Sequence, residues 1–191
     1  MARPRSFDCD VVLDKAVETF REKGFDGTSV EDLEKATGLR RASLYGAFGD
    51  KRALYLAALR RYQGTQGVRL LETLNAEKSG RAAIERLFAI VIDAAVDDPC
   101  GCLLANAASE RSAHDAGVAR CVSDNRRRVE GALLAAVLRG RADGSVKARG
   151  DARSSARFLF AATLGIRALG RTECARAELK AVASEALKTL G

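Results

Sequence analysis

Residues 28–54 read TSVEDLEKATGLRRASLYGAFGDKRAL, and this stretch decides the fold. Ser29 is a residue type that caps helix N-termini, and two acids follow it in what would be the first turn. Apolar residues then recur at helical spacing until Gly38, a residue type that commonly ends a helix. We therefore predict a short helix between Ser29 and Gly38.

A second short helix is predicted directly after that glycine, over residues 40–48. Leu44 and Phe48 are four residues apart, so they share one helix face and can pack inward. Arg40, Arg41 and Ser43 can then face outward. Two short helices joined by a glycine-containing turn form a helix-turn-helix unit, here at about residues 29–48.

The flanking segments are predicted to be helical as well. Residues 8–23 carry apolar positions at helical spacing, and a longer helix is expected over residues 51–75 after an N-cap at Asp50. Further helices are predicted at residues 80–96, 102–112, 115–138, 151–169 and 173–190. The expected architecture is all-α: a three-helix bundle in residues 1–50 and a larger helical domain in residues 51–191, which begins with the linking helix.

The composition agrees with an all-α fold. Pro occurs twice and Trp is absent, while 47% of the 191 residues are hydrophobic, a balance that favours helices over a turn-rich β fold. Five cysteines, an odd number, indicate thiols rather than a secreted disulfide framework. No apolar run approaches the roughly 20 residues of a membrane span, and no signal segment is recognised, so we expect a cytoplasmic protein without membrane contact.

The formal net charge of +7 is compatible with a polyanionic partner. The excess is not concentrated in the helix-turn-helix region, because residues 1–62 hold 12 Lys and Arg against 10 Asp and Glu, a balance of +2. A basic face can still form there, since several basic residues stand apart from the acids of the first helix. They are Arg3, Arg5, Arg40, Arg41, Lys51 and Arg52.

Residues 28–54 are similar to the helix-turn-helix of the TetR family of transcriptional regulators. The preceding segment, with Ala16, Phe20, Gly24 and Phe25 at their spacing, resembles the family's first helix and turn. The resemblance covers the first quarter to third of the chain, and it is specific because several spaced elements agree at once. It implies DNA binding by the N-terminal bundle, followed by an all-helical, six-helix-type domain for effector binding and dimerisation.

By this resemblance the second helix of the motif enters the major groove of DNA. Arg41 and Ser43 would reach base edges, and Arg40 would reach either a base or a phosphate. The residues expected to hold the DNA backbone are Thr28, Ser29, Tyr45 and Lys51. Gly46 and Ala47 depart from the family's commonest pattern, so contacts by those side chains are not carried over. The alternative for the arginine pair is a solvated charged face.

The family generally dimerises through its last two helices and keeps an effector pocket in the preceding helical bundle. Apolar stripes with small residues in 158–169 and 179–187 suit a homodimer, which would match a palindromic operator. The alternative is an ordinary intramolecular core. The expected pocket-lining residues are Leu87, Phe88, Val91, Leu103, Leu104 and Phe160, each of which also fits a plain core position. The resemblance does not identify the effector.

Residues 98–110 resemble the Gly-Cys-Leu segment that opens a helix in a TetR subgroup, some members of which respond to electrophiles or oxidants through cysteine. Cys102 is expected near a helix N-terminus, whose positive end favours the thiolate form. Cys100 could resolve a sulfenic acid formed there, although two residues make a tight ring. The alternative is that Cys102 is a small buried hydrophobe. No metal site is expected, because structural zinc needs four ligands and His114 has no evident partner set.

The sequence therefore predicts a sequence-specific DNA-binding regulator without a cofactor, typically a repressor released from its operator by a small molecule or a thiol-reactive signal. A nonspecific DNA-binding protein is one rival, and it would show a low specificity ratio despite salt-sensitive affinity. An enzyme is the other, but no phosphate loop, paired-carboxylate motif or nucleophile elbow supports it, and no catalytic residue is assigned.

Overall fold

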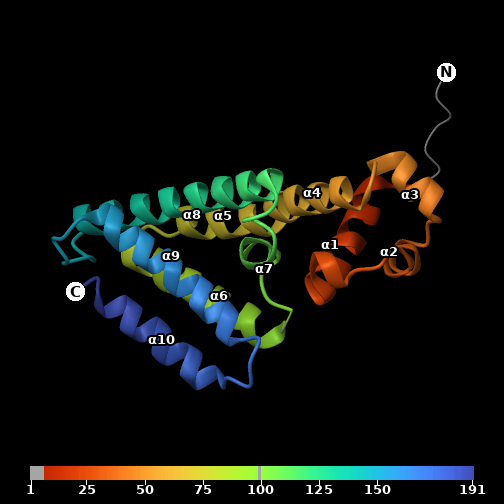
Figure 1. Ribbon diagram of the computed structural model, residues 1–191. Coiled ribbons are helices and arrows are strands. Elements are labelled where there is room, and N and C mark those ends of the chain that lie inside the picture. The colour runs from red at the N-terminus through yellow and green to blue at the C-terminus, as the bar shows by residue number, and fades with distance from the viewer. Residues whose placement is uncertain (1–6, 99) are drawn as a thin grey trace. The chain divides into compact units, whose positions relative to one another are not determined.

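The computed structural model describes residues 7–98 and 100–191, and every regular element in this part of the chain is a helix (Figure 1). The predicted all-α fold is confirmed. The helices are α1 (Cys9–Gly27), α2 (Val30–Thr37), α3 (Arg41–Phe48), α4 (Lys51–Tyr62), α5 (Val68–Ala76), α6 (Gly80–Asp97), α7 (Leu103–Glu110), α8 (Ala116–Ala142), α9 (Ala152–Leu169) and α10 (Arg176–Lys188), with a π-helical turn η1 (Gln63–Gly67) between α4 and α5. Arg3 and Arg5, expected in the basic face, lie outside the described residues.

The chain divides into two compact units. The first unit comprises the chain up to Thr65 together with Leu103–Val122, and the second comprises Gln66–Cys102 and Ser123–Gly191. Compactness thus groups α4 and α7 with the helix-turn-helix, whereas the sequence-based division by function falls between residues 50 and 51. The assignment of effector binding and dimerisation to residues 51–191 stays a prediction.

The core of the first unit is built where α1 packs against α4, α2 and α7. The rings of Phe20 and Tyr55 meet edge to face with centroids 4.9 Å apart, and the ring of Phe25 lies 5.0 Å from Tyr55. Aromatic pairs at these separations stabilise a core beyond the area they bury. Leu33 and Leu44 are fully buried in the same unit, so both helices of the helix-turn-helix present an inner face to this core.

Residues 51–76 are helical throughout, as expected for residues 51–75, but η1 between α4 and α5 is π-helical rather than α-helical. The five residues of η1 include two glycines, which weaken the regular ladder, and the hydroxyl of Thr65 donates to the carbonyl oxygen of Arg61 at 3.1 Å. Apolar spacing continues on both sides of the turn, so the sequence predicted the extent of the helix but not this change in helix type.

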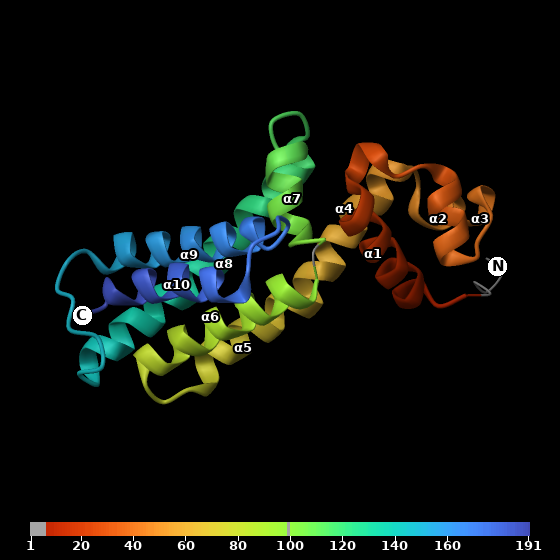
Figure 2. The same cartoon turned by 90° about the horizontal axis from the view of Figure 1, so that it is seen from below.

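The second unit is organised around α6, which packs against α5, α9 and α10; Figure 2 shows α5 beside α6 and α9 beside α10. Apolar residues recur along α6 at intervals of three and four, and Ile84, Leu87, Phe88 and Val91 are buried. This pattern places one face of α6 in the main apolar core of the unit. Among the described residues, no helix combines the length and apolar character needed to cross a membrane.

Candidate DNA-binding surface

The start of α2 is fixed by a reciprocal cap between Ser29 and Asp32. The backbone N–H of Asp32 donates to Ser29 Oγ at 3.0 Å, and the backbone N–H of Ser29 donates to Asp32 Oδ2 at 2.9 Å. Lys23 Nζ lies 2.5 Å from Asp32 Oδ1, and this hydrogen bond, more than those from Ser29, lowers the pKa of Asp32 well below its usual range. A charged carboxylate therefore supports the helix N-terminus at neutral pH.

The turn between α2 and α3 is held by Glu34 on both sides. Gly38 adopts the left-handed conformation at a φ of 72°, and its N–H donates to the carbonyl oxygen of Glu34 at 2.8 Å. The side-chain Oε1 of Glu34 accepts the backbone N–H of Arg41 at 2.6 Å. One residue of α2 thus closes its own helix and satisfies a donor in the first turn of α3, which fixes the angle between the two helices.

Helix α3 has a buried side and an exposed side. Leu44 is completely buried and Phe48 is half-buried. The predicted base-reading residues Arg40, Arg41 and Ser43 are all exposed. The exposed residues therefore lie at the N-terminal end of α3, while Leu44 in the next turn packs into the core and holds the helix in place.

Tyr45 lies beneath Arg41. It is half-buried, and the guanidinium carbon of Arg41 lies 5.8 Å from the centre of its ring. Burial raises the pKa of Tyr45, so the hydroxyl is protonated and can donate a hydrogen bond at neutral pH. Lys51, in the first turn of α4, is half-buried with its ammonium 4.6 Å from the centre of the Phe25 ring. The remaining hydrogen-bonding capacity of that ammonium is available to an acceptor.

The two residues expected before α2 differ in position. Ser29 is exposed, whereas Thr28 is only 1% exposed and its hydroxyl donates to the carbonyl oxygen of Gly24 at 2.6 Å. The Thr28 side chain therefore supports the loop from inside. A DNA contact at Thr28 would have to come from its backbone.

Helix α7 braces the helix-turn-helix region from within the same unit, which the sequence did not predict. Gly24 has a φ of 72°, and a Cβ built there would lie 2.9 Å from Glu110 Oε2. The guanidinium of Arg111 stacks 4.6 Å from the centre of the Phe25 ring and pairs with Asp26 at 3.6 Å. These partners lie about 85 residues away in the chain, so no local pattern reports them.

Three comparisons place these features among known proteins. Residues 12–58 match the family model described as bacterial regulatory proteins, tetR family. The chain is 32% identical over 169 residues to YezE, an uncharacterised HTH-type transcriptional regulator of Bacillus subtilis (strain 168), and the match covers 87% of each chain. The chain belongs to the TetR family.

Further relatives extend over nearly the whole of this TetR-family chain. ComR, an HTH-type transcriptional repressor of Escherichia coli (strain K12), is 29% identical over 189 residues, which covers 97% of this chain and 90% of ComR. A solved cysteine mutant of the TetR family regulator CifR, in complex with 26-base-pair operator DNA, matches with a TM-score of 0.88 at 30% identity. That match covers 99% of this chain and 100% of the other. The protein is a sequence-specific DNA-binding transcriptional regulator, and its family is not one of enzymes.

The expected effector-site residues of this TetR-family protein fall into two groups. Leu87, Phe88 and Val91 are buried together in the apolar core of the second unit, and Phe160 packs against that core. Leu103 and Leu104 are buried in the first unit. Cys102 directly precedes α7 and is a half-buried thiol.

Proposed function

We propose that this TetR-family protein is a cytoplasmic repressor that binds a palindromic operator as a homodimer, with α3 in the major groove of each half-site. The observation that carries the proposal is the exposure of Arg40, Arg41 and Ser43 at the N-terminal end of α3, while Leu44 anchors the same helix in the core. Repression is favoured over activation because ComR, similar along nearly the full chain, is a repressor.

The proposed contacts divide into base reading and positioning. Arg41 and Ser43 reach base edges, where an arginine suits the two acceptors of guanine, and Arg40 contacts a base or a phosphate. The proposed backbone contacts are made by Ser29, Tyr45, Lys51 and the backbone of Thr28. The register of the protein on the DNA depends on the α2–α3 turn, since the Glu34 side chain fixes the start of α3.

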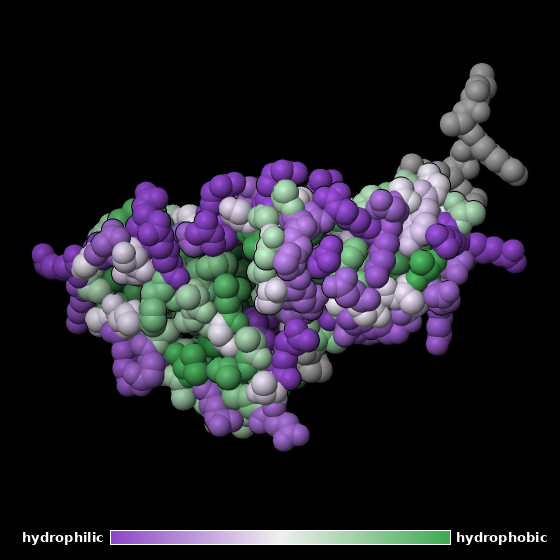
Figure 3. Space-filling view, viewed as in Figure 1, coloured by the Kyte–Doolittle hydropathy of each residue, from purple (hydrophilic) through white to green (hydrophobic). Residues whose placement is uncertain are grey.

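The proposed dimer uses α9 and α10. Along α9, residues 158, 161, 165 and 168 recur at intervals of three and four, and all four are exposed; they are Phe158, Ala161, Gly165 and Ala168. Figure 3 shows apolar side chains gathered over α9 and α10. Phe158 is 49% exposed, and a Cβ at Gly165 would meet nothing within 4 Å. An exposed stripe of small and apolar residues lets a second copy approach closely.

The proposed signal is a small molecule or a thiol-reactive compound that releases the operator. The half-buried thiol of Cys102 at the start of α7 supports a thiol-reactive signal, because α7 packs against α1 of the DNA-binding unit. If the signal is thiol-reactive, the Cys102→Ser variant binds the operator in the presence of N-ethylmaleimide, whereas the Cys174→Ser variant is still released by it. If N-ethylmaleimide affects operator binding by the wild-type protein and by Cys102→Ser equally, only the small-molecule signal remains.

Selection of bound fragments from random-sequence DNA tests the main proposal. We expect the selected pool to converge on a short palindrome whose half-sites lie about one helical turn apart. A footprint over that palindrome should persist in excess nonspecific DNA. Failure of the pool to converge, with salt-sensitive binding to every fragment, would instead support a nonspecific DNA-binding protein.

A further inference from the structure

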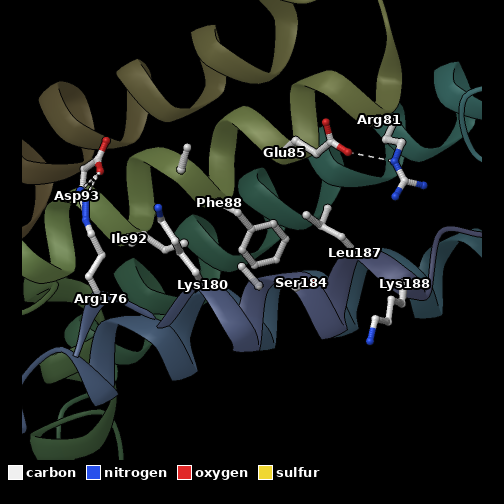
Figure 4. Close-up of a pocket in the computed structure, with 12 residues that line it drawn as sticks. Arg81, Glu85, Phe88, Ile92, Asp93, Arg176, Lys180, Ser184, Leu187 and Lys188 are labelled. Carbon is white, nitrogen blue, oxygen red and sulfur yellow. Dashed lines mark hydrogen bonds and ion pairs between the residues drawn. The ribbon is translucent and has the colours of Figure 1, made fainter. Parts of the chain in front are cut away.

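A groove of about 520 Å³ runs between α6 and α10 in the second unit (Figure 4). Its floor is apolar: the buried ring of Phe88, which is only 1% exposed, lies in the middle, with Ile92 on one side and the half-buried Leu187 on the other. Phe88 is among the residues expected to line the family's effector pocket, but here it also borders a groove on the α10 side. A groove of this volume accommodates a small organic molecule.

Ion pairs border the groove toward both of its ends. Arg81 Nε lies 2.9 Å from Glu85 Oε1, and Arg81 Nη1 also donates to the carbonyl oxygen of Gly191 at 2.7 Å. Toward the other end, Arg176 pairs with Asp93. Because the two arginines are matched by carboxylates on α6, these border charges are largely compensated. The two pairs limit the groove to about 18 Å along α6, which is the length of helix between residues 81 and 93.

The charge in the middle of the groove is not compensated in this way. Lys180 extends from α10 toward α6, between the Arg176–Asp93 pair and Phe88 (Figure 4). Within residues 7–98 and 100–191, its ammonium has no hydrogen bond or ion pair. Ser184, one helical turn further along α10, is exposed and also faces the groove. An ammonium and a hydroxyl beside an apolar floor match a ligand with an anionic head and an apolar body.

The groove also lies away from the proposed dimer stripe. Relative to the buried positions Leu179 and Ala183, helical geometry places Lys180 and Ser184 on one flank of α10 and Val182 on the other. The first flank faces α6, and α9 also packs against α10. A dimer formed through the exposed stripe of α9 and the Val182 flank of α10 therefore leaves the α6 flank open.

We propose that this groove binds a small amphipathic carboxylate, with the carboxylate held by Lys180 and Ser184 and an aromatic or short aliphatic body lying against Leu187. Lys188 provides the matched control, because it lies on the same helix at the edge of the groove, but its ammonium is paired with Glu185 at 2.5 Å.

The test is calorimetric titration of the full-length protein with 4-phenylbutyrate and with its neutral amide. We expect the carboxylate to bind, the amide to bind at least about fivefold more weakly, and Lys180→Met to weaken carboxylate binding by a similar factor. Lys188→Met should change the affinity less than about twofold, since its exposed charge is already paired with Glu185.

Ser184→Trp supplies a second, independent check, because a large side chain at this exposed position fills the groove without entering the core. We expect it to abolish carboxylate binding while leaving the circular dichroism spectrum unchanged. The proposal is overturned if no binding is measurable up to millimolar concentration, if acid and amide bind equally, or if both Lys180→Met and Ser184→Trp bind like the wild-type protein. Wild-type binding by both variants would show that 4-phenylbutyrate binds in the interior of the helical bundle and not in the groove.

Discussion

Arg52 and Asp115 lie 63 residues apart in the chain and form a two-pronged ion pair, with Nε 2.6 Å from Oδ2 and Nη2 2.8 Å from Oδ1. Asp115 is buried and also accepts the backbone N–H groups of Gly117 and Val118, so it caps α8 as well. One carboxylate therefore ties the first turn of α4, next to Lys51, to the start of α8 within the first unit.

This ion pair predicts an acid-sensitive stability. The hydrogen bond from Arg52 holds the pKa of Asp115 far below its ordinary value of 3.8. A carboxyl whose pKa is lower in the folded state stabilises the fold above that ordinary value and loses this effect as the pH falls below it. We expect Asp115→Asn to lower the free energy of unfolding by about 1–2 kcal/mol at pH 7, because Asn keeps the cap but loses the ion pair.

Urea unfolding at several pH values measures this effect. The difference between the wild-type protein and Asp115→Asn should shrink as the pH falls below 4 and disappear in strong acid. The control is Asp124→Asn on α8, whose pair with Arg127 is exposed on both sides, and its effect should stay below about 0.5 kcal/mol. A difference that is constant with pH would contradict the role given to Asp115.

Gly24→Ala is expected to destabilise the protein by about 1–2 kcal/mol. The cause is the backbone, because a φ of 72° strains any residue with a Cβ, whereas the exposed carboxylate of Glu110 can move aside. Gly131→Ala on α8 is the matched control. Its Cβ would meet nothing within 4 Å, so it should stabilise by about 0.5–1 kcal/mol through helix propensity. Equal unfolding midpoints for the two variants would show that Gly24 is not constrained.

Gly165→Arg is expected to break the proposed dimer without unfolding the chain. The position is exposed and open on α9, so the isolated chain tolerates the side chain, but a close helix contact would bury an unpaired charge. We expect the dimer dissociation constant, measured by sedimentation, to rise more than about 100-fold. Gly131→Arg should sediment like the wild-type protein. A dimer that survives Gly165→Arg would place the interface elsewhere.

Tyr45→Phe is expected to weaken DNA binding by about 0.5–1.5 kcal/mol, and by the same amount on every sequence. The ring is retained, so its packing beneath Arg41 is preserved and only the hydroxyl bond to phosphate is lost. Fluorescence anisotropy with the selected palindrome and with a scrambled fragment measures both losses. A loss confined to the palindrome would assign Tyr45 to base reading instead.

The helix-turn-helix was predictable because its determinants are local. Ser29 and Gly38 bound α2 through contacts no more than four residues away, and the spacing of Leu44 and Phe48 defines the inner face of α3. The partners of Gly24 and Arg52 were not predictable, since both come from α7 and the start of α8 and depend on tertiary packing.

The same reasoning applies to the second unit. The helices were expected near their observed positions because their apolar residues recur at helical spacing. The groove could not be expected, since it forms only where α6 and α10 pack side by side and, among the described residues, leave Lys180 without a carboxylate partner. Phe88 illustrates the limit, because its apolar character predicts burial but not which neighbouring helix it faces.

The most direct test of the reading role of α3 compares the affinities of the wild-type protein and Arg41→Ala for every single-base-pair variant of the selected palindrome. We predict that Arg41→Ala weakens binding to the palindrome by about 1–3 kcal/mol and removes discrimination at one symmetric pair of positions only. Unchanged affinity, or a uniform loss that leaves every base preference intact, would show that Arg41 does not read the operator and would contradict the account.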